Sequence, residues 1–156
     1  MQLYLMRHGE AGHEARYDRE RSLTETGFHH TALMSEWLKS SGVKFQLVLV
    51  SPYVRAQQTW QEVSSHFPTP RKSKVLDELV PAADPEMAAR LVLAYAEQYQ
   101  AENVLVISHM PLLGYMVSEL VPGIEPPLFA TSSVAMVDII GHHSELMWQQ
   151  TAHSIS

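Results

Sequence analysis

Three polar segments each contain an arginine, a histidine or both, and each directly follows a short apolar run. The segments are Arg7-His8-Gly9-Glu10, Ser51-Pro52-Tyr53-Val54-Arg55 and Ser108-His109. Guanidinium groups bind phosphate through paired hydrogen bonds, so Arg7 and Arg55 suit a phosphoryl ligand. A histidine between such arginines acts either as an acid or base or as a nucleophile.

His8 is the best nucleophile that this sequence offers. The chain contains no cysteine, no glycine-rich phosphate-binding loop and no Asp-x-Asp element for a metal-assisted reaction. A neutral imidazole can attack phosphorus in line to give a phosphohistidine, which water then hydrolyses. Arg7, Arg55 and His109 would stabilise charge on the phosphoryl oxygens, which supplies most of the catalysis in phosphoryl transfer. We therefore expect neither a metal nor a cofactor.

Alternating strands and helices are expected to bring these segments together. Buried strands are predicted at Leu3–Met6, Leu47–Val50 and Val104–Ile107, a further short strand at Val75–Leu79, and a C-terminal hairpin of Ser133–Ile140 and Glu145–Thr151. Helices are predicted over residues 25–40 after Thr24, from Pro52 to before Pro68, from Pro85 to about Gln98 after Asp84, and from Pro111 to about Leu120.

This alternation predicts one α/β domain over residues 1–156, with a mostly parallel sheet, flanking helices and a C-terminal antiparallel hairpin. In such sheets, ligands bind at the carboxyl ends of the parallel strands. The three polar segments lie at those ends. Helix amino ends near Pro52 and Pro111 would add amide donors and partial positive charge there.

The charge distribution argues against nucleic-acid and membrane partners. The chain carries 11 basic and 17 acidic residues, a net charge of −6, and all 11 Lys and Arg lie in the first 90 residues. No basic field remains to attract a polyanion or an anionic membrane. The apolar runs are too short to span a membrane, and Arg7 comes too early to leave room for a signal peptide. We therefore expect a cytoplasmic protein.

Four segments in order resemble the histidine phosphatase superfamily, which has the phosphoglycerate mutase-like fold. They are Arg7-His8-Gly9-Glu10, Leu23–Gly27, Ser51–Thr59 and Ile107-Ser108-His109. The short chain, the lack of a helical insert, and the segments Ser108–Gly114 and Pro126–Ser132 are similar to SixA-type phosphohistidine phosphatases. The resemblance thereby extends over nearly the whole chain.

The resemblance implies that His8 is the nucleophile, that Arg7 and Arg55 hold the phosphoryl group, and that His109 is the second catalytic histidine. It also implies a substrate class, phosphohistidine in a protein such as the phosphotransfer domain of a two-component relay. A leaving imidazole, with a pKa of about 6.5, can depart neutral once protonated on its far nitrogen. It therefore needs less acid assistance than an alkoxide.

The sequence departs from the family pattern at two places. Relatives that act on sugar phosphates usually follow the Arg-His-Gly tripeptide with Ser or Thr and then Asn, where this chain has Ala11 and Glu14. The general acid of those relatives is a carboxylate for which Glu78 is the nearest match, and Glu78 either enters the pocket or is a solvated strand-end acid. Arg21 either contacts the phosphate or the rim of the site, or it is a solvated loop residue.

Two other functions remain open from the sequence. One keeps the chemistry but takes a small phosphate ester as substrate. The other is a phosphate-recognition module without turnover, which would not need a nucleophilic His8.

Overall fold

A six-stranded mixed sheet forms the centre of the molecule in the computed structural model, which describes residues 1–155. The strands are β1 (Gln2–Arg7), β2 (Leu47–Val50), β3 (Lys72–Val75), β4 (Asn103–Ser108), β5 (Val134–Ile140) and β6 (His143–Gln150). They lie in the order β3-β2-β4-β1-β5-β6. The first four are parallel, whereas β5 and β6 are antiparallel to their neighbours. The predicted class, a single α/β domain, is confirmed.

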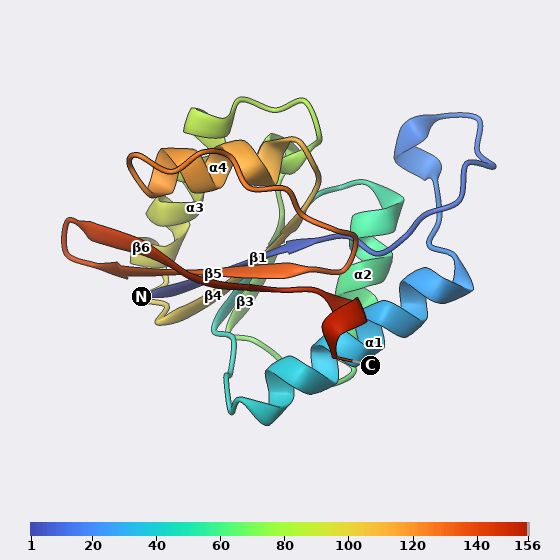
Figure 1. Cartoon of the computed structure of the whole chain (residues 1–156), viewed down its shortest axis with the longest axis horizontal. Coiled ribbons are helices and arrows are strands. Elements are labelled where there is room, and N and C mark those ends of the chain that lie inside the picture. Colours follow the sequence, from blue (N-terminus) through green and yellow to red (C-terminus); the bar gives the residue numbers. More distant parts are fainter. Residues whose placement is uncertain (156) are drawn as a thin grey trace.

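In the described part of the chain, four helices cover the two faces of the sheet: α1 (Glu25–Ser40), α2 (Val54–Ser64), α3 (Pro85–Gln98) and α4 (Leu112–Leu120). Helices α3 and α4 pack together on one face, and α1 and α2 lie on the other (Figure 1). The predicted caps are present, since the Thr24 hydroxyl accepts a hydrogen bond from the Gly27 amide and the Asp84 carboxylate accepts one from the Glu86 amide.

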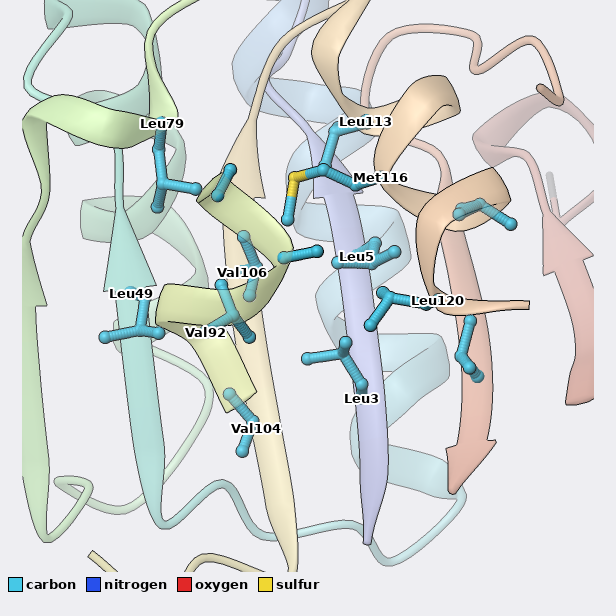
Figure 2. Packing of buried hydrophobic residues seen from close by; sticks show 14 of the residues in the cluster. Leu3, Leu5, Leu49, Leu79, Val92, Val104, Val106, Leu113, Met116 and Leu120 are labelled. Atoms are coloured by element: carbon cyan, nitrogen blue, oxygen red, sulfur yellow. The ribbon is translucent and has the colours of Figure 1, made fainter. Parts of the chain in front are cut away.

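The side chains of the central strands alternate between two buried layers. On β1, Leu3 and Leu5 pack under α3 and α4 (Figure 2), whereas Tyr4 and Met6 pack under α1 and α2. Strands β2 and β4 alternate in the same way. Because both faces are covered, β2 is apolar throughout and β1 and β4 are apolar at every position between their polar ends, which explains the unbroken apolar runs.

One predicted strand is wrong and one predicted helix begins too early. Strand β3 covers Lys72–Val75, and residues 77–79 form a 3-10 turn instead of continuing it. Pairing with β2 ends where the Leu76 amide binds the Val50 carbonyl, and the following turn buries both Leu76 and Leu79. Helix α2 begins at Val54, because the Ser51 hydroxyl accepts from the Tyr53 amide and holds residues 51–53 in a turn.

Strand register brings the three polar segments to one edge of the sheet. Arg7 pairs with Ser108, and Val50 pairs with Ile107. Beyond the strands, the amides of His8 and Ser51 donate to the carbonyls of Ser108 and Ile107 at 3.1 and 3.0 Å. Backbone pairing by itself therefore aligns these segments. Within residues 1–155, no helix has both the length and the apolar character needed to cross a membrane.

The buried layers predict how stability responds to truncation. Leu5 is fully buried, so Leu5→Ala should lower the free energy of unfolding by about 2–5 kcal/mol through lost burial and the cavity left behind. Val75→Ala is the control, because Val75 is 55% exposed on the edge strand and should change stability by less than about 1 kcal/mol. Urea unfolding measures both, and equal losses would contradict the described core.

Candidate active site

The imidazole of His8 is buried just beyond the end of β1, with one ring nitrogen free of a proton. Its Nδ1 lies 2.7 Å from the Gly9 carbonyl oxygen. A carbonyl only accepts hydrogen bonds, so Nδ1 carries the ring proton. The Nε–H of Arg55 donates to His8 Nε2 at 3.3 Å, so the lone pair of Nε2 faces a guanidinium group. This is the tautomer that a nucleophile requires.

The backbone after His8 is fixed by close packing against two helices. The Gly9 amide donates to the Thr59 hydroxyl of α2 at 3.0 Å. A Cβ atom on Gly9 would lie 2.8 Å from the Gly27 carbonyl oxygen, too close for any larger residue to fit without displacement. The glycine in this motif therefore lets the chain approach α1 and sets the position of His8.

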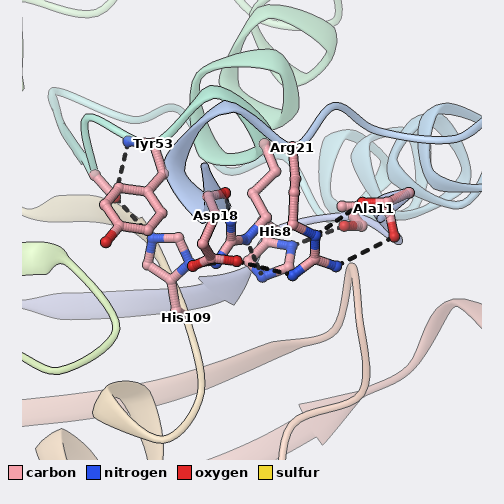
Figure 3. Close-up of polar contacts among 10 residues, drawn as sticks. His8, Ala11, Asp18, Arg21, Tyr53 and His109 are labelled. Carbon is pink, nitrogen blue, oxygen red and sulfur yellow. Dashed lines mark hydrogen bonds and ion pairs between the residues drawn. The ribbon is translucent and has the colours of Figure 1, made fainter. Parts of the chain in front are cut away.

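Arg55 is buried on the first turn of α2, and its hydrogen-bond donors point into the site. Its Nη1 and Nη2 donate to the backbone carbonyl and carboxylate of Asp18 at 2.8 and 3.2 Å. Its guanidinium also lies over the Tyr53 ring, 5.0 Å from the ring centre. Arg21 pairs with the other Asp18 oxygen at 3.1 Å and donates to the Gly12 carbonyl at 2.8 Å. Figure 3 shows this network.

His109 is almost fully buried, and its ring centre lies 5.0 Å from that of His8. Its Nε2 lies 2.7 Å from the Ser51 hydroxyl oxygen. That oxygen already accepts from the Tyr53 amide, which leaves the hydroxyl proton available to donate to Nε2. A neutral His109 then carries its own proton on Nδ1, as a further hydrogen-bond donor.

Within residues 1–155, two buried side-chain nitrogens have no hydrogen-bond partner, Arg7 Nε and His109 Nδ1. Both belong to this site. Arg7 uses Nη1 to bind the Phe129 carbonyl at 2.8 Å, which holds its guanidinium in place. Buried polar groups in folded proteins are almost always paired, so two unpaired donors next to His8 indicate an anionic ligand with several acceptor oxygens.

Burial keeps both histidines neutral at physiological pH. Burial lowers the pKa of His8 to about 4, and the positive charges of Arg55, Arg7 and Arg21 add to this against the opposing Gly9 hydrogen bond. Burial and the neighbouring His8 lower the pKa of His109 to about 2. Burial also lowers the pKa of Arg7, with Arg55 adding to the effect.

The structure brings together most of the predicted site residues. His8 contacts both Arg55 and His109, the charge of Arg7 acts on His8, and Arg21 joins the group through Asp18. Glu78 is half-buried in the 3-10 turn, and within residues 1–155 its side chain forms no hydrogen bond or ion pair with them. That turn does adjoin the site, since the Ser108 hydroxyl donates to the Leu79 carbonyl at 2.6 Å.

Three contributing residues were not identified from the sequence. Ser51 and Thr59 lie within a recognised motif, but a serine or threonine near a strand end does not reveal which side chain it will bind. Asp18 lies in a loop of mixed charges, which favoured a solvated segment. Only the folded chain places it on Arg55.

Comparison with known proteins identifies the family of this chain. The sequence matches the family described as histidine phosphatase superfamily (branch 1) over residues 3–80. The chain therefore belongs to the histidine phosphatase superfamily.

Two bacterial proteins are similar over most of their length. Phosphohistidine phosphatase SixA of Escherichia coli is 44% identical over 139 residues, which cover 89% of this chain and 86% of that protein. The SixA homolog of Haemophilus influenzae is 36% identical, with 97% and 96% covered. A structure of the protein histidine phosphatase SixA complexed with tungstate matches with a TM-score of 0.94 and 39% identity, covering both chains in full. This match confirms the expected phosphoglycerate mutase-like fold.

The lowered histidine pKa values predict a loss of stability in acid. An unfolded histidine gains a proton near pH 6.5, whereas buried His109 does not until about pH 2. The contribution of His109 to the free energy of unfolding is therefore fully present above pH 6.5. It falls by about 1.4 kcal/mol per pH unit as the pH drops from there toward the pKa of His109 in the folded protein.

Urea unfolding between pH 4.5 and 6 measures this slope. His109→Gln should reduce it by about 1.4 kcal/mol per pH unit, whereas His142→Gln, at an exposed turn position, should leave it unchanged. Equal slopes in all three proteins would contradict a neutral, buried His109.

Proposed function

We propose that this protein is a metal-independent phosphatase that removes the phosphoryl group from phosphohistidine in a protein, through a phosphorylated His8. The observation that carries this proposal is the unprotonated Nε2 of His8, which faces the Arg55 guanidinium in a site that also holds two unpaired buried donors. A nucleophile needs a lone pair at physiological pH, and the transferred group needs donors for its oxygens. His8 can supply the lone pair, and Arg55, Arg7 and His109 can supply the donors.

The geometry supports a two-step reaction. Arg7, Arg55 and His109 donate to the phosphoryl oxygens while His8 Nε2 attacks phosphorus, and the bond from phosphorus to the substrate nitrogen breaks. The proton stays on His8 Nδ1, and its hydrogen bond to the Gly9 carbonyl stabilises the positive charge that develops on the ring. A water molecule then attacks phosphorus, His8 leaves with its lone pair on Nε2, and phosphate is released.

His109 suits the role of a donor whose charge depends on the ligand. It is neutral in the empty site, because burial and the nearby positive charges disfavour a proton. A phosphoryl dianion would favour the charged form of the imidazole and raise its pKa. His109 would therefore strengthen its hydrogen bond as negative charge arrives, with Ser51 fixing the orientation of the ring.

Phosphohistidine is the favoured substrate for two reasons. The imidazole leaving group needs little acid assistance, and within residues 1–155 the side chain of Glu78 is not held against His8, Arg55 or His109. The similarity to phosphohistidine phosphatase SixA of Escherichia coli points to the same substrate. We further propose that the partner is a histidine phosphotransfer domain of a two-component relay, acting in the cytoplasm.

Substitution of His8 tests the reaction. His8→Ala should lower the rate of phosphate release from a phosphorylated phosphotransfer domain by at least about 10³-fold, because the nucleophile is lost. Acid-labile phosphate should be trapped on the wild type and be absent from this variant. His142→Ala, at an exposed turn, is the matched control and should retain full activity. Full turnover by His8→Ala would refute the mechanism.

The alternative substrate, a small phosphate ester, depends on an acid for its alkoxide leaving group. If Glu78 supplies that acid, Glu78→Gln should lower ester hydrolysis by about 10²-fold or more and leave phosphohistidine hydrolysis within a few-fold. Asp77→Asn is the neighbouring control and should change neither rate, since Asp77 is exposed. A panel of esters assayed beside the phosphorylated domain measures the preference. Faster turnover of an ester would favour the alternative.

A recognition module without turnover is a second alternative. It would bind a model phosphoramidate without releasing phosphate. The neutral His8 argues against it, because a simple phosphate clamp gains nothing from a lone pair that faces its ligand.

A further inference from the structure

The carboxylate of Asp18 already accepts from Arg55, at a donor that a phosphoryl group would use. It has no role in the two-step reaction described above. Asp18 accepts from Nη2 of Arg55 through Oδ2 at 3.2 Å and from Nη1 through its backbone carbonyl at 2.8 Å. These are the paired donors that a phosphoryl group would use. In the view of Figure 3, the Asp18 carboxylate lies between His109 and His8.

The Asp18 side chain is exposed enough to move away from Arg55 into solvent. Its side chain is 56% exposed, whereas that of Arg55 is 6% exposed. Residues 13–20 are all exposed, and a single 3-10 turn, Asp18–Glu20, is their only regular element. Arg21 anchors the end of this segment to the Gly12 carbonyl, and that bond does not depend on the carboxylate.

The carboxylate is not needed to hold Arg55 in position. The Nε of Arg55 binds His8, its guanidinium lies over the Tyr53 ring, and Nη1 binds the backbone carbonyl of Asp18. Removal of the Asp18 charge leaves all three contacts. The main effect of the carboxylate at this place is therefore its negative charge.

We propose that Asp18 is an internal anion that competes with phosphate for Arg55 and lowers the affinity of the site for free orthophosphate. A phosphoryl dianion and a carboxylate repel each other, so the two cannot share the guanidinium at full strength. A phosphorylated protein can offset this repulsion through contacts outside the site, whereas free phosphate has no such contacts. Asp18 thus favours product release and selects phosphoryl groups delivered by a larger substrate. This inference rests on the proposed phosphoryl site.

Calorimetric titration with inorganic phosphate at pH 7.5 and constant ionic strength tests the proposal without turnover. Asp18→Asn keeps the size and hydrogen-bonding capacity of the side chain and removes its charge, so the dissociation constant for phosphate should fall on the order of tenfold. Glu20→Gln removes the same charge from the same turn, at an exposed side chain. It should change the dissociation constant by less than about twofold because of screening by salt.

A second variant separates charge from geometry. Asp18→Ala removes the side chain altogether and should also bind phosphate more tightly, and product inhibition by phosphate should strengthen in both variants. An unchanged or weakened phosphate affinity in Asp18→Asn and Asp18→Ala, with binding by the wild type intact, would overturn this inference alone. If neither the wild type nor the variants bind phosphate, the proposed phosphoryl site itself fails, and the inference fails with it.

Discussion

The site depends on keeping two imidazoles uncharged beside three guanidinium groups. His8 and His109 are buried between the sheet edge and the helices, and burial is the largest cause of their lowered pKa values. The arginines add to this by repelling a further positive charge. The same surroundings that make a protonated histidine costly make an incoming anion favourable. A free lone pair on His8 and surroundings that favour an anion thereby arise from one arrangement.

Backbone geometry sets the positions of the residues in this arrangement. The parallel strands β1, β2 and β4 end in register, so that His8, Ser51 and His109 emerge side by side. Each imidazole is then oriented by one short hydrogen bond, from His8 to the Gly9 carbonyl and from Ser51 to His109. The positive field is local, since the chain as a whole carries a net charge of −6. One phosphoryl group can be attracted without a general affinity for polyanions.

The sequence predicts much of this, because apolar runs and the polar residues that follow them are local signals. The three central strands, the four helices, the hairpin, and the meeting of His8, Arg55 and His109 all follow from such signals. The turn at residues 77–79 does not, because its cause is the burial of Leu76 and Leu79 against distant elements. The contact of Asp18 with Arg55 spans 37 positions of sequence and depends on the path of an exposed loop. No residue pattern within that loop indicates it.

The atom of His8 that receives the phosphoryl group tests the central claim most directly. Because Nδ1 donates to the Gly9 carbonyl, the phosphoryl group can be accepted only at Nε2. The protein is labelled with nitrogen-15 at its histidines and trapped rapidly in the phosphorylated form. Phosphorus–nitrogen coupling in its NMR spectra then identifies the bonded atom. The account predicts phosphate on Nε2 of His8. Phosphate on Nδ1, on another residue or on no residue during turnover would contradict it.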